Sequence, residues 1–213
     1  MASLRSMLRH SAFHRDFVRP MEDRRREAKW LAGGRVGPPP AVVKCRNILA
    51  IADLYGARIF VETGTFRGDT VARVLPRFDA IVSFEIFAPL AAAARHRFAD
   101  APKVRIIEGD SGALLDSALA GIDAPILFWL DAHYSGPGTG RGNEASPIAR
   151  EMAVIHNTRI AAGHPDMVLI DDARVFDGEG GYPERDPFMA ETAARWGYTA
   201  RTADDCIFFL PKP

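Results

Sequence analysis

Acidic residues recur along the chain at the points where short apolar segments end. Five successive segments close in this way. A single acid at the start of a loop is often plain surface, but a carboxylate can also bind a cation, accept a proton or hydrogen-bond a hydroxyl group. If the five segments end at a common edge, their acids form one shared site. These acids are Glu62, Glu85, Asp110, Asp131 and the pair Asp171 and Asp172.

Two glycines follow the first acid in the stretch FVETGTFRGDT, residues 60–70. Glycine allows a sharp turn and a close approach of the backbone to a ligand. The spacing of Gly64 and Gly68 fits neither the dinucleotide pattern GxGxxG nor the phosphate-loop pattern GxxxxGK[ST], and Glu62 in the turn disfavours a phosphate. Glu85 lies 23 residues after Glu62, near the ~20-residue offset at which an acid meets ribose hydroxyls in nucleotide-binding folds. The stretch therefore favours a nucleoside that carries a positive charge.

The elements that position these residues alternate between strands and helices. Apolar strands separated by helices predict a mostly parallel α/β sheet that is covered on both faces, and ligands of such sheets lie beyond the carboxyl ends of the strands. Residues 198–205 and 206–212 predict a final antiparallel pair, and residues 41–57 predict an amphipathic helix ahead of the first strand. The expected parallel strands span 58–62, 80–86, 104–110, 125–133 and 166–176.

The order and spacing of these motifs resemble those of the class I S-adenosylmethionine-dependent methyltransferases. The pattern E-x-G-x-x-x-G looks like the first motif of that family, Glu85 looks like its ribose-binding acid, and GDS at 109–111 looks like its adenine-side motif. Phe66 stands where the family often has a middle glycine. The absence of this glycine resembles the pattern of catechol-type and related small-molecule O-methyltransferases. The resemblance covers about residues 45–213 and implies a Rossmann-like doubly wound fold. The donor-binding residues it implies are Glu62, Gly64, Thr65, Gly68, Glu85, Asp110 and Ser111.

Two further segments, WLDAHYSG (129–136) and VLIDDAR (168–174), resemble the D-x-H-Y signature and the later acidic strand end of a group that includes sugar and antibiotic O-methyltransferases. In metal-dependent members of that group, acids at these two strand ends hold a divalent cation. The resemblance thus implies a site for Mg²⁺, Mn²⁺ or Ca²⁺, which prefer oxygen ligands, with Asp131 and His133 as catalytic residues. The implied metal ligands are Asp131, His133, Asp171 and Asp172.

His133 and the aspartate pair each leave an alternative open. A histidine titrates near neutral pH, so His133 is expected to act as general base or metal ligand, but it could instead hydrogen-bond the backbone and close the loop. Adjacent strand residues point to opposite faces. We therefore expect one of Asp171 and Asp172 to face the site, and we favour Asp171.

Charge is unevenly distributed along the chain. The 213 residues have a net charge of zero, so the whole chain shows no nucleic-acid signature. Residues 1–46 hold eleven basic and four acidic residues, a balance of +7, and the remainder carries −7. A basic leader followed by a Gly- and Pro-rich linker predicts an N-terminal helical arm over residues 1–40 and a methyltransferase-like α/β domain over residues 41–213. The arm is expected either to cover the acceptor site or to mediate a homodimer.

Cysteine content and hydropathy bear on the cellular compartment. Cys45 and Cys206 lie far apart and form no CxxC pair, which argues against a disulfide framework and for a reducing compartment. No apolar run approaches the ~18 residues of a membrane span. The Arg-rich N-terminus faintly resembles a transit peptide but lacks the apolar core of a secretory signal, so we expect a cytoplasmic enzyme.

The motifs lead to one main functional hypothesis. We expect O-methylation of a small hydroxylated acceptor, a sugar or natural product, with the Gly-rich loop near 135–143 acting as a lid or a plain connector. Two alternatives stay open: a metal-dependent hydrolase or other nucleoside-binding enzyme on the same fold, and a non-catalytic binding module. A metal-dependent assay without methyl donor, followed by product analysis, distinguishes the methyltransferase from the first alternative, and calorimetry with S-adenosylmethionine distinguishes it from the second.

Overall fold

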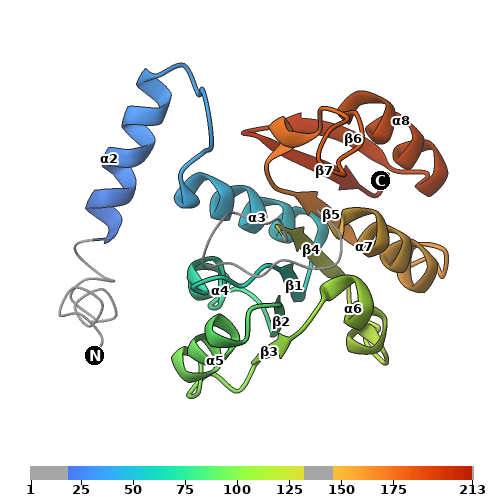
Figure 1. Ribbon diagram of the computed structural model, residues 1–213, viewed down its shortest axis with the longest axis horizontal. Helices are drawn as coiled ribbons and strands as arrows, with labels where there is room; N and C mark the ends of the chain where they lie inside the picture. The colour runs from blue at the N-terminus through green and yellow to red at the C-terminus, as the bar shows by residue number, and fades with distance from the viewer. Residues whose placement is uncertain (1–18, 132–145, 213) are drawn as a thin grey trace.

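The computed structural model describes residues 19–131 and 146–212. Its centre is a seven-stranded sheet with the order β3-β2-β1-β4-β5-β7-β6 (Figure 1). Strands β1 to β5 pair in parallel, and β7 runs antiparallel to both β5 and β6. The predicted mostly parallel sheet with a final antiparallel pair is therefore confirmed. The strands are β1 Ile59–Thr63, β2 Ala80–Glu85, β3 Val104–Glu108, β4 Ile126–Leu130, β5 Met167–Ile170, β6 Thr199–Ala203 and β7 Cys206–Leu210.

Helices cover both faces of this sheet, which places the hydrophobic core in two layers. Successive residues of a strand point to opposite faces. Leu127 and Trp129 of β4 accordingly pack with one cluster, which includes residues of α3, α4 and α5. Phe128 and Leu130 pack with the other, which includes residues of α6, α7 and α8. The helices are α2 Arg19–Ala32, α3 Ala41–Tyr55, α4 Asp69–Val74, α5 Ala88–Arg97, α6 Ser111–Leu119, α7 Ile148–Ile155 and α8 Arg185–Trp196.

Local sequence explains where the helices next to the site begin and end. The helix α3 stops at Gly56, which has a left-handed φ of 68°. The helix α4 starts after Gly68, where a Cβ atom would lie 2.6 Å from the ring of Phe98, and it ends before Pro76, which cannot continue a helix. These observations show why a glycine closes the turn that follows β1.

The fifth strand is shorter than the sequence suggested. The strand β5 ends at Ile170, because Asp172 adopts a left-handed backbone with φ 57° and leads into a 3₁₀ turn, Ala173–Val175. The expectation of a strand over 166–176 was wrong at its carboxyl end. Because β5 ends before Asp171 and Asp172, the directions of these two side chains do not follow the alternation of a strand.

The helix α2 lies at the edge of the molecule and contributes no buried residue. Two bidentate ion pairs attach it to the body: Asp23 accepts from Arg73 of α4 at 2.7 and 2.9 Å, and Glu27 accepts from Arg46 of α3 at the same distances. Within the described residues, no helix combines the length and the apolar character that a membrane span requires.

Candidate functional site

The acids predicted to share an edge come from strands that are neighbours in the sheet. Chain order reverses between β1 and β4, which makes their carboxyl ends the topological switch point where ligands bind in such sheets. Backbone hydrogen bonds continue past the strand ends: Asp131 N–H donates to the Thr63 carbonyl at 3.0 Å, and Gly109 N–H donates to the Glu85 carbonyl at 2.9 Å. The loops that carry the acids are therefore held side by side.

Glu62 is buried at the base of the turn and is only 1% exposed. The Ser83 hydroxyl donates a 2.6 Å hydrogen bond to its carboxyl group. Burial raises the pKa of Glu62 to about 8, although hydrogen bonds with Ser83 and with Thr70 of α4 pull it down. Glu62 thus connects β1 to Ser83 of β2 and to Thr70 of α4, which follows the glycine turn. These contacts hold the turn in place from the buried side.

The glycine turn rests on the carboxylate of Glu85. Phe66 N–H donates to one oxygen of Glu85 at 2.7 Å, and Phe87 N–H donates to the other at 2.9 Å. Gly64, Phe66 and Gly68 all have positive φ, at 91°, 48° and 71°, which is strained for a phenylalanine. Each carboxylate oxygen has a second lone pair, so Glu85 can accept further hydrogen bonds from a ligand hydroxyl.

The turn is closed on its inner side by Thr65 and bordered on its outer side by apolar side chains. The Thr65 hydroxyl lies 2.6 Å from the Ser83 hydroxyl and donates to the Phe84 carbonyl at 3.0 Å. Phe66 is 48% exposed, and Ile86 and Phe87 are each more than a third exposed. An exposed apolar border next to an anchored carboxylate suits a ligand with a flat apolar ring and hydroxyl groups.

Asp110 and Ser111 lie at the start of the helix α6. Asp110 caps this helix, because its carboxylate accepts from Gly112 N–H at 2.9 Å. Asp110 also pairs with Arg150 of α7 at 2.7 Å. The Ser111 hydroxyl donates to Glu151, so both residues tie α6 to α7.

A buried acid that the sequence did not single out lies on α7. Glu151 is 1% exposed. Burial raises the pKa of Glu151 to about 7, against the lowering effect of hydrogen bonds with Ser111 and Thr63. Glu151 also lines a small pocket beside Asp131 and Asp171. A carboxyl group with a pKa near neutrality can exchange a proton at physiological pH.

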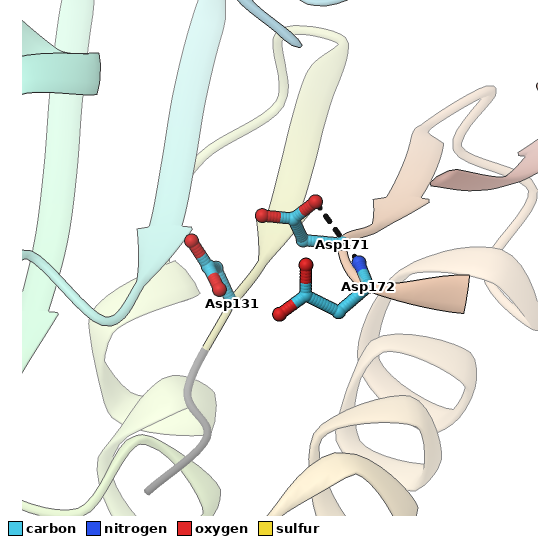
Figure 2. Close-up of side chains that lie close together, drawn as sticks. All are labelled: Asp131, Asp171 and Asp172. Atoms are coloured by element: carbon cyan, nitrogen blue, oxygen red, sulfur yellow. Dashed lines mark hydrogen bonds between the residues drawn. The ribbon is translucent and has the colours of Figure 1, made fainter. Parts of the chain in front are cut away.

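Asp131, Asp171 and Asp172 form a tight cluster at the ends of β4 and β5 (Figure 2). Each offers one carboxylate oxygen, and these oxygens lie within 4.8 Å of one another. Both members of the pair reach the cluster because the left-handed backbone of Asp172 breaks the strand alternation. Asp172 N–H also donates to the Asp171 carboxylate at 2.9 Å. The type and spacing of these oxygens fit a divalent cation.

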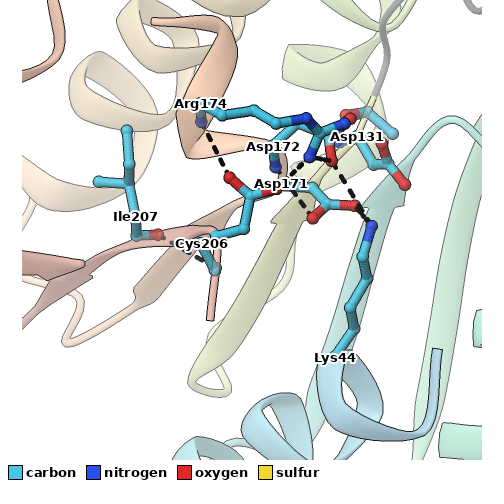
Figure 3. A network of polar contacts seen from close by, with 9 residues as sticks. Lys44, Asp131, Asp171, Asp172, Arg174, Cys206 and Ile207 are labelled. Atoms are coloured by element: carbon cyan, nitrogen blue, oxygen red, sulfur yellow. Dashed lines mark hydrogen bonds and ion pairs between the residues drawn. The ribbon is translucent and has the colours of Figure 1, made fainter. Parts of the chain in front are cut away.

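Two side-chain cations already contact this cluster (Figure 3). The ammonium group of Lys44, from α3, hydrogen-bonds Asp171 and lies 3.6 Å from a carboxylate oxygen of Asp172. Arg174 donates to Asp172 at 2.8 Å and also binds Asp205. Burial lowers the pKa of Lys44, but Asp171 and Asp131 outweigh it, so the pKa is raised above 10.5. Lys44 is therefore charged at neutral pH.

The pocket next to the cluster has an empty volume of about 230 Å³, part of it open to solvent. Ser146 lies at the start of α7, and its hydroxyl hydrogen-bonds that of Tyr182; burial raises the pKa of Tyr182. The wall combines hydroxyl and carboxyl groups with aliphatic side chains. The lining residues are Leu130, Asp131, Ser146, Ile148, Glu151, Ile170, Asp171 and Tyr182.

The sequence-predicted residues thus fall into two groups on the same edge. The glycine turn, Glu85 and Asp110 lie on the β1–β3 side, and Asp131 and the aspartate pair lie on the β4–β5 side. His133 and the Gly-rich loop lie outside the described residues. Sequence reasoning missed Lys44, Glu151 and Tyr182, because each sits in a segment with no motif and reaches the site only through tertiary packing.

Comparisons with known proteins identify the fold. No family model matches the chain, and no curated protein matches it. The O-methyltransferase TomG from Streptomyces achromogenes, involved in tomaymycin synthesis and solved with S-adenosylmethionine, matches with a TM-score of 0.61 and 16% identity over 90% of this chain and 100% of its own. The S-adenosylhomocysteine-bound methyltransferase PaMTH1 from Podospora anserina matches with a TM-score of 0.53 and 14% identity over 80% of this chain and 78% of its own.

The methyltransferase domain of bacterial CtHen1 is similar in the same way, with a TM-score of 0.54 and 12% identity over 78% of this chain and 97% of that domain. These three proteins are all methyltransferases, and each shares little sequence with this chain. Identities this low show the fold alone. The predicted class I methyltransferase fold is therefore confirmed.

Proposed function

We propose that the protein is an S-adenosylmethionine-dependent methyltransferase that methylates an oxygen of a small hydroxylated molecule, such as a sugar or natural product. The observation that carries the proposal is the position of Glu85. The residue is 6% exposed and lies at the end of β2, and backbone N–H groups of two adjacent loops orient its carboxylate. Solved structures of the same fold include complexes with S-adenosylmethionine and S-adenosylhomocysteine.

The residues of the β1–β3 side fit this donor chemically. Glu85 would accept hydrogen bonds from the ribose hydroxyls, and the exposed side chains of Ile86 and Phe87 offer an apolar surface to the adenine ring. Asp110 borders the same side. The glycines Gly64 and Gly68 have positive φ and no side chain, so the backbone of this turn could lie close to the methionine part of S-adenosylmethionine. Glu62 would hold the turn in place from the interior.

S-adenosylmethionine, when bound, supplies a methyl group on a sulfonium sulfur that an oxygen nucleophile displaces in line. The acceptor hydroxyl must therefore be oriented and must lose its proton. We propose that the pocket beside Asp131 orients the acceptor, with Ser146 and Tyr182 supplying hydroxyl groups. Asp131 and His133 are the residues proposed to take the proton, and Asp131 adjoins β1, next to the donor side.

A divalent cation is the second proposed cofactor. Asp131, Asp171 and Asp172 would hold it, and their oxygens match the ligand preference of Mg²⁺, Mn²⁺ and Ca²⁺. The cation would lower the pKa of an acceptor hydroxyl and fix its orientation. Two of these residues, Asp171 and Asp172, already pair with the Lys44 ammonium group, which would compete with the cation.

Isothermal titration calorimetry with S-adenosylhomocysteine tests the proposal directly. We expect one binding site per chain. If it binds, transfer of a labelled methyl group from S-adenosylmethionine to pooled sugars and phenols, followed by mass spectrometry, identifies the acceptor class. Absence of binding at about 1 mM S-adenosylhomocysteine, a concentration at which even weak ligands register, contradicts the assignment.

A further inference from the structure

We propose that Lys44 is the built-in counter-cation of the Asp131–Asp171–Asp172 cluster and that a divalent cation binds there only by displacing the Lys44 ammonium group. The inference rests on the metal site of the proposed function and assigns a role to a residue on α3, outside the strand ends. It predicts that the cluster binds either the Lys44 ammonium group or a divalent cation, but not both at once.

The position of Lys44 is unusual for a surface lysine. Its side chain is 21% exposed, and the two carboxylates that it contacts are nearly buried, with side chains 1% exposed at Asp171 and 6% at Asp172. One ammonium group therefore serves two buried acids at once. Removing the ammonium group from such a pair leaves buried negative charge with less compensation, so the cluster without Lys44 favours binding of another cation.

Lys44 and a metal ion would need the same oxygens. One oxygen of Asp171 accepts from Lys44, and the other accepts from Asp172 N–H. Asp172 accepts from Arg174 on the oxygen that also lies 3.6 Å from Lys44. A dication held by these carboxylates would lie within a few ångströms of the ammonium, where like charges repel strongly. Metal binding thus requires the flexible lysine side chain to move away.

A purely structural role is the competing interpretation. In that case the Lys44 ion pair only fastens α3 to the end of β5, and replacing Lys44 would reduce stability without creating any metal affinity. Competition instead predicts that replacing Lys44 increases the affinity for a divalent cation, because the carboxylates lose the ammonium group and a divalent cation would replace it. The two interpretations therefore differ in a quantity that is independent of catalysis.

The test is calorimetric titration of the full chain with MnCl₂, using wild type, Lys44→Met and the control Lys212→Met, whose lysine is exposed. We expect Lys44→Met to bind Mn²⁺ at least tenfold more tightly than wild type, with Lys212→Met unchanged. Equal or weaker binding by Lys44→Met, or no binding by any variant, overturns the proposal. Titration of the same samples with S-adenosylhomocysteine tests the donor site separately, so failure of one assignment is distinguishable from failure of the other.

Wild-type protein provides a second measurement in case Lys44→Met does not fold. Nuclear magnetic resonance of ¹⁵N-labelled lysine side chains detects an ammonium group that is held by carboxylates. We expect the Lys44 signal to shift or disappear as MgCl₂ is added, while the Lys212 signal stays in place. A Lys44 signal that stays unchanged at saturating Mg²⁺ overturns the proposal. Failure of the protein to bind Mg²⁺ also overturns it.

Discussion

The two sides of the carboxyl edge satisfy their acids in different ways. On the β1–β2 side, Glu62 is hydrogen-bonded by hydroxyl groups and Glu85 by backbone N–H groups. On the β4–β5 side, Asp171 and Asp172 are bound by the side-chain cations Lys44 and Arg174. Asp110, farther along the edge, combines a backbone N–H group with an ion pair.

This difference separates acids that look equivalent in the sequence. Neutral hydrogen-bond donors orient a carboxylate without cancelling its charge. Glu85 is therefore suited to hydrogen-bond a ligand, and its negative charge would attract a positively charged methyl donor. Side-chain cations cancel the charge of the aspartate pair until another cation replaces them. The first group is therefore expected to control donor affinity, and the second to control stability and cation binding.

The largest effect is expected from removing Asp171. The substitution Asp171→Ala leaves Lys44 partly buried without its main partner, which should lower the free energy of unfolding by about 3 kcal/mol. Urea denaturation measures the change. Asp171→Asn keeps the shape of the side chain and still offers an acceptor oxygen, so its loss should be smaller. A change below about 1 kcal/mol in Asp171→Ala would mean that the pair contributes no more than a surface ion pair.

The donor side is tested by Glu85→Gln. Losing the charge should weaken S-adenosylhomocysteine binding by about 10- to 100-fold, because a hydrogen bond to a charged group contributes about 1.5–3 kcal/mol. Calorimetry measures the affinity, and Mn²⁺ binding should not change. Glu108→Gln is a matched control, since Glu108 is exposed at the end of β3 and pairs with Arg95. Equal affinities in Glu85→Gln and Glu108→Gln would remove Glu85 from the donor site.

The sequence predicted the fold and the position of the acids at the strand ends, because both follow from local patterns. Apolar runs alternate with helical segments, and acids end those runs. It could not predict Lys44 or Glu151, since their positions depend on how α3 and α7 pack against the sheet. It also could not predict that Asp172 joins Asp171 in the cluster, because the strand pattern gives no sign of the left-handed residue that ends β5 early.

Stability as a function of pH tests the buried carboxyl group of Glu62. Its folded pKa of about 8 lies above the ordinary 4.5, so between these values the unfolded chain releases a proton that the folded protein retains. Stability should therefore fall as pH rises through this window. Glu62→Gln should make that fall shallower by up to about 1.4 kcal/mol per pH unit. Urea denaturation from pH 5 to pH 8 measures the slope, and an unchanged slope in the variant would contradict the assignment.

The smallest effect is expected at the helix α2. Its Asp23–Arg73 pair has side chains 13% and 15% exposed and lies on a helix without buried residues. Asp23→Ala should lower the free energy of unfolding by about 1 kcal/mol or less, and the loss should shrink in high salt because ions screen the pair. A salt-independent loss as large as that of Asp171→Ala would show that α2 is part of the core.

The crystal structure of a complex with S-adenosylhomocysteine tests the central claim most directly. We predict that the nucleoside lies across the ends of β1 and β2, with its ribose hydroxyls within hydrogen-bonding distance of the Glu85 carboxylate. A nucleoside bound on another face of the sheet, or one whose ribose makes no contact with Glu85, would contradict the account.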